Sequence, residues 1–352
     1  MPVDGCIVFY GNASTTLGAG HLSRLLALAA SFSSTGSQRI CFYCKECPQS
    51  LAERINAAGF SLKQAPAVLT TDALRSLNPQ LLLIDDYHLN AEEWLQIAAA
   101  KVPVIVIDDQ VSATAFYADL VINPAPQATV TDYKMRTQAQ LFCLGPAFTI
   151  LRPEFSVTMP VSIELRQRLL VTLGGADVKQ LALPLSQALL QRFITPCPEI
   201  CLVLGSMNIS ALPELQQLTA TYPQFRVEIN SNQMATLMAN SGLAIAAAGG
   251  TLGELAAMTV PTLALICVDN QLPALTSPLA GGWYQAIDLR QLKPQKQSTV
   301  PPEINTLADK AFTLWQDLTL RTVMSQLASQ IVDTKGCERI VQQAQQLLVR
   351  RD

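Results

Sequence analysis

A histidine follows a glycine-containing loop close to the start of the chain. The loop at 11–20 comes after the apolar run at 5–10, and the residues that follow it have the pattern of a helix. Gly18 and Gly20 allow close backbone approach, and His21 falls in or near the first helical turn. The positive end of a helix disfavours an imidazolium, so we predict a neutral His21 that can accept a proton near pH 7. The alternative is a capping or packing histidine.

Acidic residues crowd the ends of two later apolar runs. The run at 80–85 ends in Asp85 and continues into Asp86, Tyr87 and His88. Polar residues bunched there indicate a site, although Asp85 by itself is better interpreted as a helix cap or turn residue.

Asp108 and Asp109 end the run at 103–108, and the same two interpretations stay open for them. Neither acidic pair has the further ligands that a bound metal requires.

Two Gly-Gly pairs in the second half each stand between an apolar run and a helical pattern. Free N–H groups and the helix dipole at such helix starts can receive phosphate oxygens. Glu254, one turn into the second helix, could accept hydrogen bonds from a ribose diol, or it could be a solvated residue that complements the dipole. The predicted nucleotide-binding residues are Gly174, Gly175, Gly249, Gly250, Thr251 and Glu254.

Short β-branched runs alternate with amphipathic helical stretches along the whole chain. The runs lie at 5–10, 39–44, 80–85, 103–108, 119–123, 141–145, 168–175, 199–205, 225–229, 243–247, 262–267 and 284–288. This alternation predicts α/β architecture with two doubly wound, Rossmann-like domains, and ligands bind beyond the carboxyl ends of such strands. The predicted parts are an N-terminal domain at 1–153, a second domain at 161–322 and a helical segment at 323–352.

Composition narrows the possible partners. The chain has 352 residues, 49% of them hydrophobic, and a net charge of −3 without a basic cluster, so nucleic acid is not expected. The N-terminus has no basic region before its apolar run, and the long apolar stretch at 243–268 contains glycines and a proline. We therefore predict a cytoplasmic protein without a signal peptide or membrane span.

Nine cysteines are scattered through apolar segments, as buried thiols of a reducing compartment would be. Cys41, Cys44 and Cys47 have a spacing that can hold zinc or iron–sulfur, but a fourth ligand is missing nearby. We predict no metal and no cofactor.

Taken in order, the motifs G-A-G-H-L-S-R, I-D-D-Y, I-L-R-P-E-F, L-G-G-A-D, A-G-G-T-x-x-E and V-D-N-Q resemble the UDP-sugar hydrolases of pseudaminic acid biosynthesis. That family cleaves UDP-2,4-diacetamido-2,4,6-trideoxy-β-L-altropyranose. The resemblance runs from about Cys6 to Val341. It implies a GT-B-like fold with an interdomain cleft, related to the lipid II N-acetylglucosaminyltransferase. It also implies water attack at the anomeric carbon, with inversion and without a metal.

The resemblance assigns roles by position. His21 would be the general base, Arg24 its accompanying arginine, and Tyr87 a further catalytic residue. The predicted substrate-binding residues are Gly20, Arg24, Asp86, Asn270 and Gln271, and the glycine-loop residues named above match the UDP side.

The chain departs from the family pattern at three places. The family usually begins F-R-A-D-x-S, where this chain has Tyr10 and Asn12 in place of the cation and the acid. Asp86 replaces a histidine, and Phe148 with Thr149 replaces Tyr-Ala. These changes leave the exact sugar open.

Two other functions are compatible with the sequence. The first is a glycosyltransferase with a UDP-sugar donor, because transfer to water and transfer to a hydroxyl use the same base and leaving group. The second is a non-catalytic nucleotide-sugar binding protein.

Overall fold

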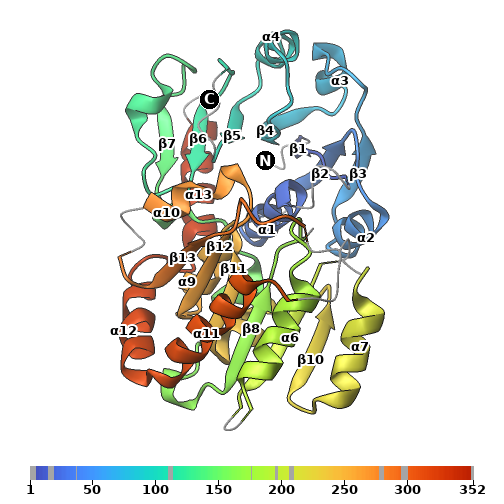
Figure 1. Cartoon of the computed structure of the whole chain (residues 1–352). Helices are drawn as coiled ribbons and strands as arrows, with labels where there is room; N and C mark the ends of the chain where they lie inside the picture. Colours follow the sequence, from blue (N-terminus) through green and yellow to red (C-terminus); the bar gives the residue numbers. More distant parts are fainter. Residues whose placement is uncertain are drawn as a thin grey trace. The chain divides into compact units, whose positions relative to one another are not determined.

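The structure is a computed structural model that describes residues 5–14, 20–36, 38–109, 114–175, 177–194, 197–205, 210–276, 281–294 and 300–349. Contacts within the chain divide it into two units, Met1–Pro153 with Thr334–Asp352, and Glu154–Asp333. Each unit contains one parallel sheet with helices around it (Figure 1).

The described part of the first unit has a seven-stranded sheet in the order β3-β2-β1-β4-β5-β6-β7, in which every pairing is parallel. Because the order runs outward from β1 in both directions, the sheet is doubly wound. Its strands are β1 (Cys6–Gly11), β2 (Arg39–Cys44), β3 (Ser61–Gln64), β4 (Pro79–Asp85), β5 (Val104–Ile107), β6 (Leu120–Asn123) and β7 (Leu141–Leu144). Its helices are α1 (Gly20–Ser34), α2 (Gln49–Ala57), α3 (Thr71–Arg75), α4 (Ala91–Ala99), η1 (Val130–Tyr133), η2 (Pro146–Phe148) and α13 (Gly336–Val349).

Both faces of this sheet are covered by apolar side chains, as alternation along the buried strands requires. Ile7 and Phe9 of β1 belong to the core cluster that contains residues of α1 and α13. Val8 and Tyr10 belong to the cluster on the other face, which contains residues of α4. The C-terminal helix therefore completes the core of the first unit.

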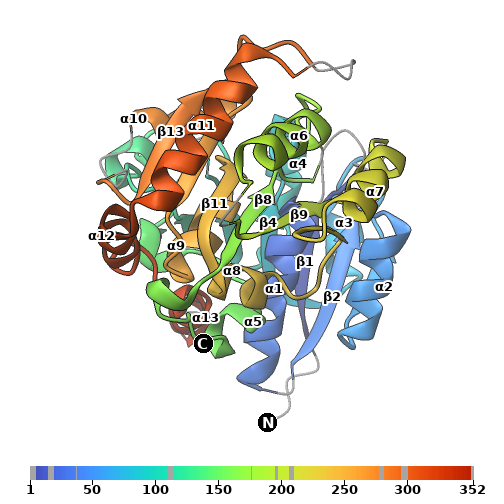
Figure 2. The same cartoon turned by 60° about the horizontal axis from the view of Figure 1, so that its bottom comes forward.

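The second unit contains a six-stranded parallel sheet in the order β10-β9-β8-β11-β12-β13 among the described residues. Its strands are β8 (Arg168–Thr172), β9 (Glu199–Leu204), β10 (Phe225–Ile229), β11 (Ser241–Ala247), β12 (Thr262–Ile266) and β13 (Tyr284–Asp288). Its helices are α5 (Pro153–Val157), η3 (Ile163–Leu165), α6 (Ala182–Arg192), α7 (Leu212–Thr221), α8 (Met234–Ala239), α9 (Thr251–Ala257), η4 (Asp269–Gln271), α10 (Pro273–Thr276), α11 (Pro302–Gln316) and α12 (Leu318–Ala328). Figure 2 shows α6 and α11 on one side of this sheet.

The prediction of two doubly wound parallel sheets is confirmed. β3 is the strand that the sequence analysis did not predict, because this edge strand is largely exposed and has no apolar run. In the part of the chain that the structure describes, no helix is both long enough and apolar enough to cross a membrane.

Candidate active site

The start of α1 lies against the carboxyl ends of β1 and β4. Gly11 at the end of β1 pairs with Asp85 at the end of β4. A Cβ atom at Gly11 would lie 2.7 Å from Leu25 Cδ1 and 3.1 Å from the Asp85 carbonyl oxygen. The absence of a side chain at Gly11 therefore lets α1 approach the strand ends, which brings the first turns of α1 to Asp85.

His21 and Asp85 form a close pair. The His21 Nδ1 atom lies 2.6 Å from Asp85 Oδ1, and the Asp85 side chain is fully buried. The pKa of Asp85 lies below its usual value. Burial raises this pKa, but the Arg24 cation and the His21 hydrogen bond lower it by a larger amount. An ionised Asp85 can only accept, so Nδ1 carries the proton and donates it. Nε2 is then left to accept a proton, and among the described residues it has no protein partner.

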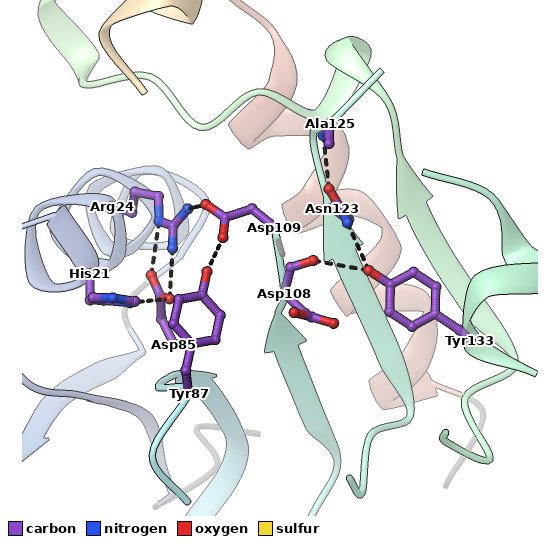
Figure 3. Close-up of polar contacts among 9 residues, drawn as sticks. All are labelled: His21, Arg24, Asp85, Tyr87, Asp108, Asp109, Asn123, Ala125 and Tyr133. Carbon is purple, nitrogen blue, oxygen red and sulfur yellow. Dashed lines mark hydrogen bonds and ion pairs between the residues drawn. The ribbon is translucent and has the colours of Figure 1, made fainter. Parts of the chain in front are cut away.

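Arg24 links this pair to a second carboxylate (Figure 3). Its Nε and NH2 atoms donate to the Asp85 oxygens at 2.9 and 2.8 Å, which is a bidentate contact. Its NH1 atom pairs with Asp109, and the Tyr87 hydroxyl donates to the other Asp109 oxygen. The Tyr87 ring closes the arrangement, because it meets the His21 ring edge to face with centroids 5.0 Å apart. We call His21, Arg24, Asp85, Tyr87 and Asp109 the charged ring.

The helix start was expected to disfavour the His21 imidazolium and so to lower the pKa of this residue, and this direction is wrong. Burial does lower the pKa of His21. The hydrogen bond and the charge of Asp85 raise it by a larger amount, so the pKa lies above 6.5. The neutral imidazole therefore dominates only above this raised pKa. The effect of Asp85 could not be predicted from local sequence, because Asp85 lies 64 positions from His21 along the chain.

Asp85 is not the cap or turn residue that the sequence analysis favoured. Its side chain is fully buried and bonds to both His21 and Arg24. Asp109, for which two interpretations stayed open, lies in the charged ring, whereas Asp108 is buried beside it. The signal that could have identified Asp85 and Asp109 is their common place at the carboxyl ends of β4 and β5, which are neighbours in the sheet.

A small pocket opens beside the charged ring. Its lining residues are Asn12, His21, Asp85, Asp86, Tyr87 and His88. The Asn12 amide nitrogen donates to Asp86 Oδ2 at 2.6 Å, and the His88 backbone N–H donates to Asp86 Oδ1 at 2.7 Å. Asn12 is itself held by the backbone N–H groups of Lys45 and Glu46, so the Asp86 carboxylate has a fixed position in this pocket.

The cysteine spacing at 41–47 does not produce a ligand cluster. Cys41 and Cys44 belong to core clusters on opposite faces of the sheet. Within the described ranges, no group of at least three His, Cys, Asp or Glu side chains converges as a metal would require.

The glycine loops of the second unit follow the carboxyl ends of β8 and β11, the two central strands of its sheet. Gly174 and Gly175 follow β8, and Gly249 with Gly250 follows β11, the strand that pairs with β8. Gly174 has a φ of 77°, which favours glycine. At Gly174, Gly249 and Gly250 an added Cβ would meet no atom within 4 Å, so these backbone segments are open to an approaching group.

Gly205, directly after β9, is a further glycine of these loops that was not predicted from the sequence. A Cβ atom there would lie 2.8 Å from the Gly175 backbone, so the two loops pack too closely for a side chain.

The remaining predicted residues of the second unit follow the carboxyl ends of β11 and β12 in the same sheet. Thr251 begins α9, and Glu254 lies one turn further along that helix. Asn270 is exposed in η4, after β12. The Gln271 side-chain oxygen accepts from the backbone N–H of Cys267 at 2.7 Å, so this side chain closes its own loop.

The structure therefore brings His21, Arg24 and Tyr87 together with Asp86 in the first unit. Gly20 is exposed as the first residue of α1, and Gly18 lies outside the described residues. The predicted nucleotide-binding residues, with Asn270 and Gln271, follow the carboxyl ends of β8, β11 and β12 in the second unit. None of these placements assigns a role, so the roles stay predictions.

Comparisons with known proteins support the resemblance. No protein-family model matches the chain. The chain is 24% identical over 268 residues to the UDP-2,4-diacetamido-2,4,6-trideoxy-β-L-altropyranose hydrolase of Campylobacter jejuni, covering 75% of this chain and 93% of that protein. It is 25% identical over 274 residues to the spore coat polysaccharide biosynthesis protein SpsG of Bacillus subtilis, covering 76% of each. In fold it is similar to MurG of Acinetobacter baumannii, with a TM-score of 0.64, 15% identity and coverage of 98% of this chain and 100% of that chain.

These findings confirm the predicted resemblance and the GT-B-like class of fold. The similarity to the Campylobacter jejuni hydrolase extends over most of both chains. At 15% identity, the similarity to MurG shows the fold alone.

Replacing Asp85 with asparagine should lower the pKa of His21. The substitution removes the carboxylate that raises this pKa, and burial and the Arg24 cation, which both lower it, remain. The chain has only two histidines, so an NMR titration can follow His21 directly, with His88→Gln to assign the signals. The same variant should lose about 1–3 kcal/mol of unfolding free energy, because the hydrogen bonds from Arg24 and His21 lose their charged acceptor, while Arg24 is half-buried and keeps Asp109 as a partner. An unchanged His21 pKa in the folded variant would contradict the assigned pairing.

Proposed function

We propose that this chain is an enzyme that hydrolyses a UDP-activated sugar and releases UDP. The carrying observation is the His21–Asp85 pair, in which an ionised carboxylate holds Nδ1 and leaves Nε2 without a partner among the described residues. The similarity to a protein named as a UDP-sugar hydrolase supports the choice of substrate class. By the same support, the substrate is a 2,4-diacetamido-2,4,6-trideoxy sugar of the pseudaminic acid type.

In the proposed reaction, His21 acts as general base. Nε2 takes a proton from water, the water oxygen forms a bond to the anomeric carbon, and the bond from that carbon to the diphosphate oxygen breaks. UDP leaves with the bonding electrons, and His21 later returns its proton to solvent. A direct displacement by water inverts the anomeric carbon. Because only neutral His21 can act, the reaction slows as the pH falls below the pKa of this residue.

The charged ring supports this role by fixing the imidazole. Asp85 selects the tautomer, and it stabilises the imidazolium that forms when Nε2 takes the proton. We assign Tyr87 to the same machinery through its ring contact with His21. Its hydroxyl donates to Asp109, and burial and this carboxylate keep the Tyr87 pKa far above its ordinary value, so it stays protonated.

We assign UDP to the second unit. Open glycine loops after two adjacent strands can offer backbone N–H groups to the diphosphate, and Thr251 lies beside them. Glu254 would accept from the ribose hydroxyls. Gly20, Asn270 and Gln271 complete the predicted substrate contacts. In this proposal the diphosphate leaves without help from a metal ion or cofactor.

The Asp86 carboxylate bears on the identity of the sugar. Its recorded partners are N–H donors, and within the described residues it has no ion pair. We assign it to substrate binding, where it would accept from N–H or O–H groups of the sugar. Asn12 and Asp86 both differ from the pattern of the resembled hydrolases and contact each other, so the sugar can differ from theirs in this region.

A cytoplasmic location and the absence of nucleic-acid and membrane partners stay predictions.

Replacing His21 with alanine should lower UDP release by roughly two to four orders of magnitude, the usual contribution of a general base. UDP affinity should hardly change, because UDP is assigned to the other unit. The assay measures UDP release from the UDP-sugar without an acceptor, and calorimetry measures UDP binding. Release that requires an added acceptor would identify a glycosyltransferase, and binding without release would identify a non-catalytic protein. Wild-type turnover in the variant would exclude His21 as base.

Replacing Glu254 with alanine should instead weaken UDP binding, by about 1.5–3 kcal/mol for a charged acceptor of two hydrogen bonds. Glu214→Ala is the matched control, because Glu214 is an exposed carboxylate in the first turn of α7 in the same unit. Calorimetry with UDP alone compares the variants. Equal affinities of wild type and Glu254→Ala would place the ribose elsewhere.

A further inference from the structure

A buried tyrosine holds the backbone that leads into Asp109. Tyr133 is the last residue of η1, and its side chain is fully buried. Its hydroxyl donates to the carbonyl oxygen of Asp108 at 2.9 Å (Figure 3). Asp108 directly precedes Asp109, so this bond fixes the backbone from which the second carboxylate of the charged ring extends.

Asn123 gives this hydrogen-bond chain a single direction. The Ala125 backbone N–H donates to Asn123 Oδ1 at 2.8 Å, which turns the amide nitrogen toward Tyr133. That nitrogen donates to the Tyr133 hydroxyl oxygen at 2.8 Å. With its oxygen accepting from Asn123, the hydroxyl directs its own proton to Asp108.

Ring packing holds Tyr133 in place, and a backbone hydrogen bond holds Asp108. The Tyr133 ring meets Phe116 at a centroid distance of 6.3 Å and Phe142 at 6.0 Å. The Asp108 backbone N–H donates to the Ile122 carbonyl oxygen on β6 at 3.0 Å. Both the hydroxyl and the backbone that receives its proton are therefore held in place.

We propose that Tyr133 and Asn123 are positioning residues that act through Asp109. They hold its carboxylate where it can bind Arg24 and Tyr87 together, and Arg24 in turn orients Asp85 against His21. Neither residue belongs to the charged ring. The inference rests on the proposed role of His21 as base, and it extends that site to the end of β6 and to η1.

The charges that face His21 make its pKa a direct readout. The charged and titratable groups that face His21 are Arg24 on α1, Asp85 at the end of β4, Asp86, Tyr87 and His88 after it, and Asp109 after β5. If the Asp109 carboxylate moves away, the pKa of His21 loses a contribution that raises it, and the Arg24 charge is less well neutralised. Both changes lower the pKa of His21.

The test is a double-mutant cycle of Tyr133→Phe with Asp109→Asn. The phenylalanine removes one hydroxyl and keeps the ring. Alone, it should lower the pKa of His21 by roughly half a unit in an NMR titration. It should also lower turnover by about tenfold, with KM hardly changed, because the base is misplaced while the substrate contacts remain. In the Asp109→Asn background, the same substitution should change neither quantity.

Tyr43→Phe is the control, because Tyr43 is also a buried tyrosine of this sheet and, in the part of the chain that the structure describes, it makes no hydrogen bond to the charged ring. It should leave both quantities as in the wild type. An unchanged His21 pKa in folded Tyr133→Phe would overturn the inference, and so would effects of the two substitutions that simply add.

The titration separates this inference from the proposed function. A protein that releases no UDP, but in which the cycle on the His21 pKa behaves as described, would contradict the proposed function and keep the positioning role. A protein that releases UDP, but in which the effects of the two substitutions are additive, would keep the proposed function and contradict the positioning role.

Discussion

Asp85 is a fully buried carboxylate, and the first unit is arranged to supply the charge and the hydrogen-bond donors that such a group requires. An ionised carboxylate out of water is costly unless it is paired and fully hydrogen-bonded. Arg24 gives it two hydrogen bonds and His21 a third. These donors come from the first turns of α1, which reach Asp85 because Gly11 leaves room for the helix. The same contacts fix the tautomer of His21. The hydrogen bonds that stabilise the buried carboxylate therefore also leave Nε2 of His21 ready to accept a proton.

Asp109, the second carboxylate of the charged ring, is bound by the same arginine that neutralises Asp85. Arg24 uses its third guanidinium nitrogen on Asp109, and this pairing extends the charged ring to β5. The buried contacts of Tyr133 and Asn123 then extend it to η1 and β6. Neighbouring strand ends of one parallel sheet thus supply successive parts of a single site, as expected for doubly wound folds.

Much of this arrangement could be predicted from the sequence because strands and helices have local patterns. The apolar runs located the strands apart from β3, whose exposed edge position needs few apolar residues. His21 and the glycine pairs stood out because they interrupt such patterns. The pairing of Asp85 with His21 could not be predicted in this way, since it joins residues 64 positions apart whose contact depends on the packing of α1. For the same reason the predicted sign of the His21 pKa shift was wrong. The sequence shows that His21 stands at a helix start, but it does not show that the Asp85 carboxylate lies beside it.

If His21 activates water for attack at the anomeric carbon, the bond that breaks joins that carbon to the diphosphate oxygen, and isotope labelling shows which bond breaks. Hydrolysis at phosphorus would call for a metal or a cationic clamp, whereas attack at carbon needs a neutral base and a leaving group that is held in place. The measurement is mass spectrometry of the products formed from the UDP-sugar in oxygen-18 water. Attack at carbon puts the label in the free sugar, after correction for exchange at the anomeric carbon, and none in UDP. Label in the nucleotide product, or formation of UMP, would contradict it.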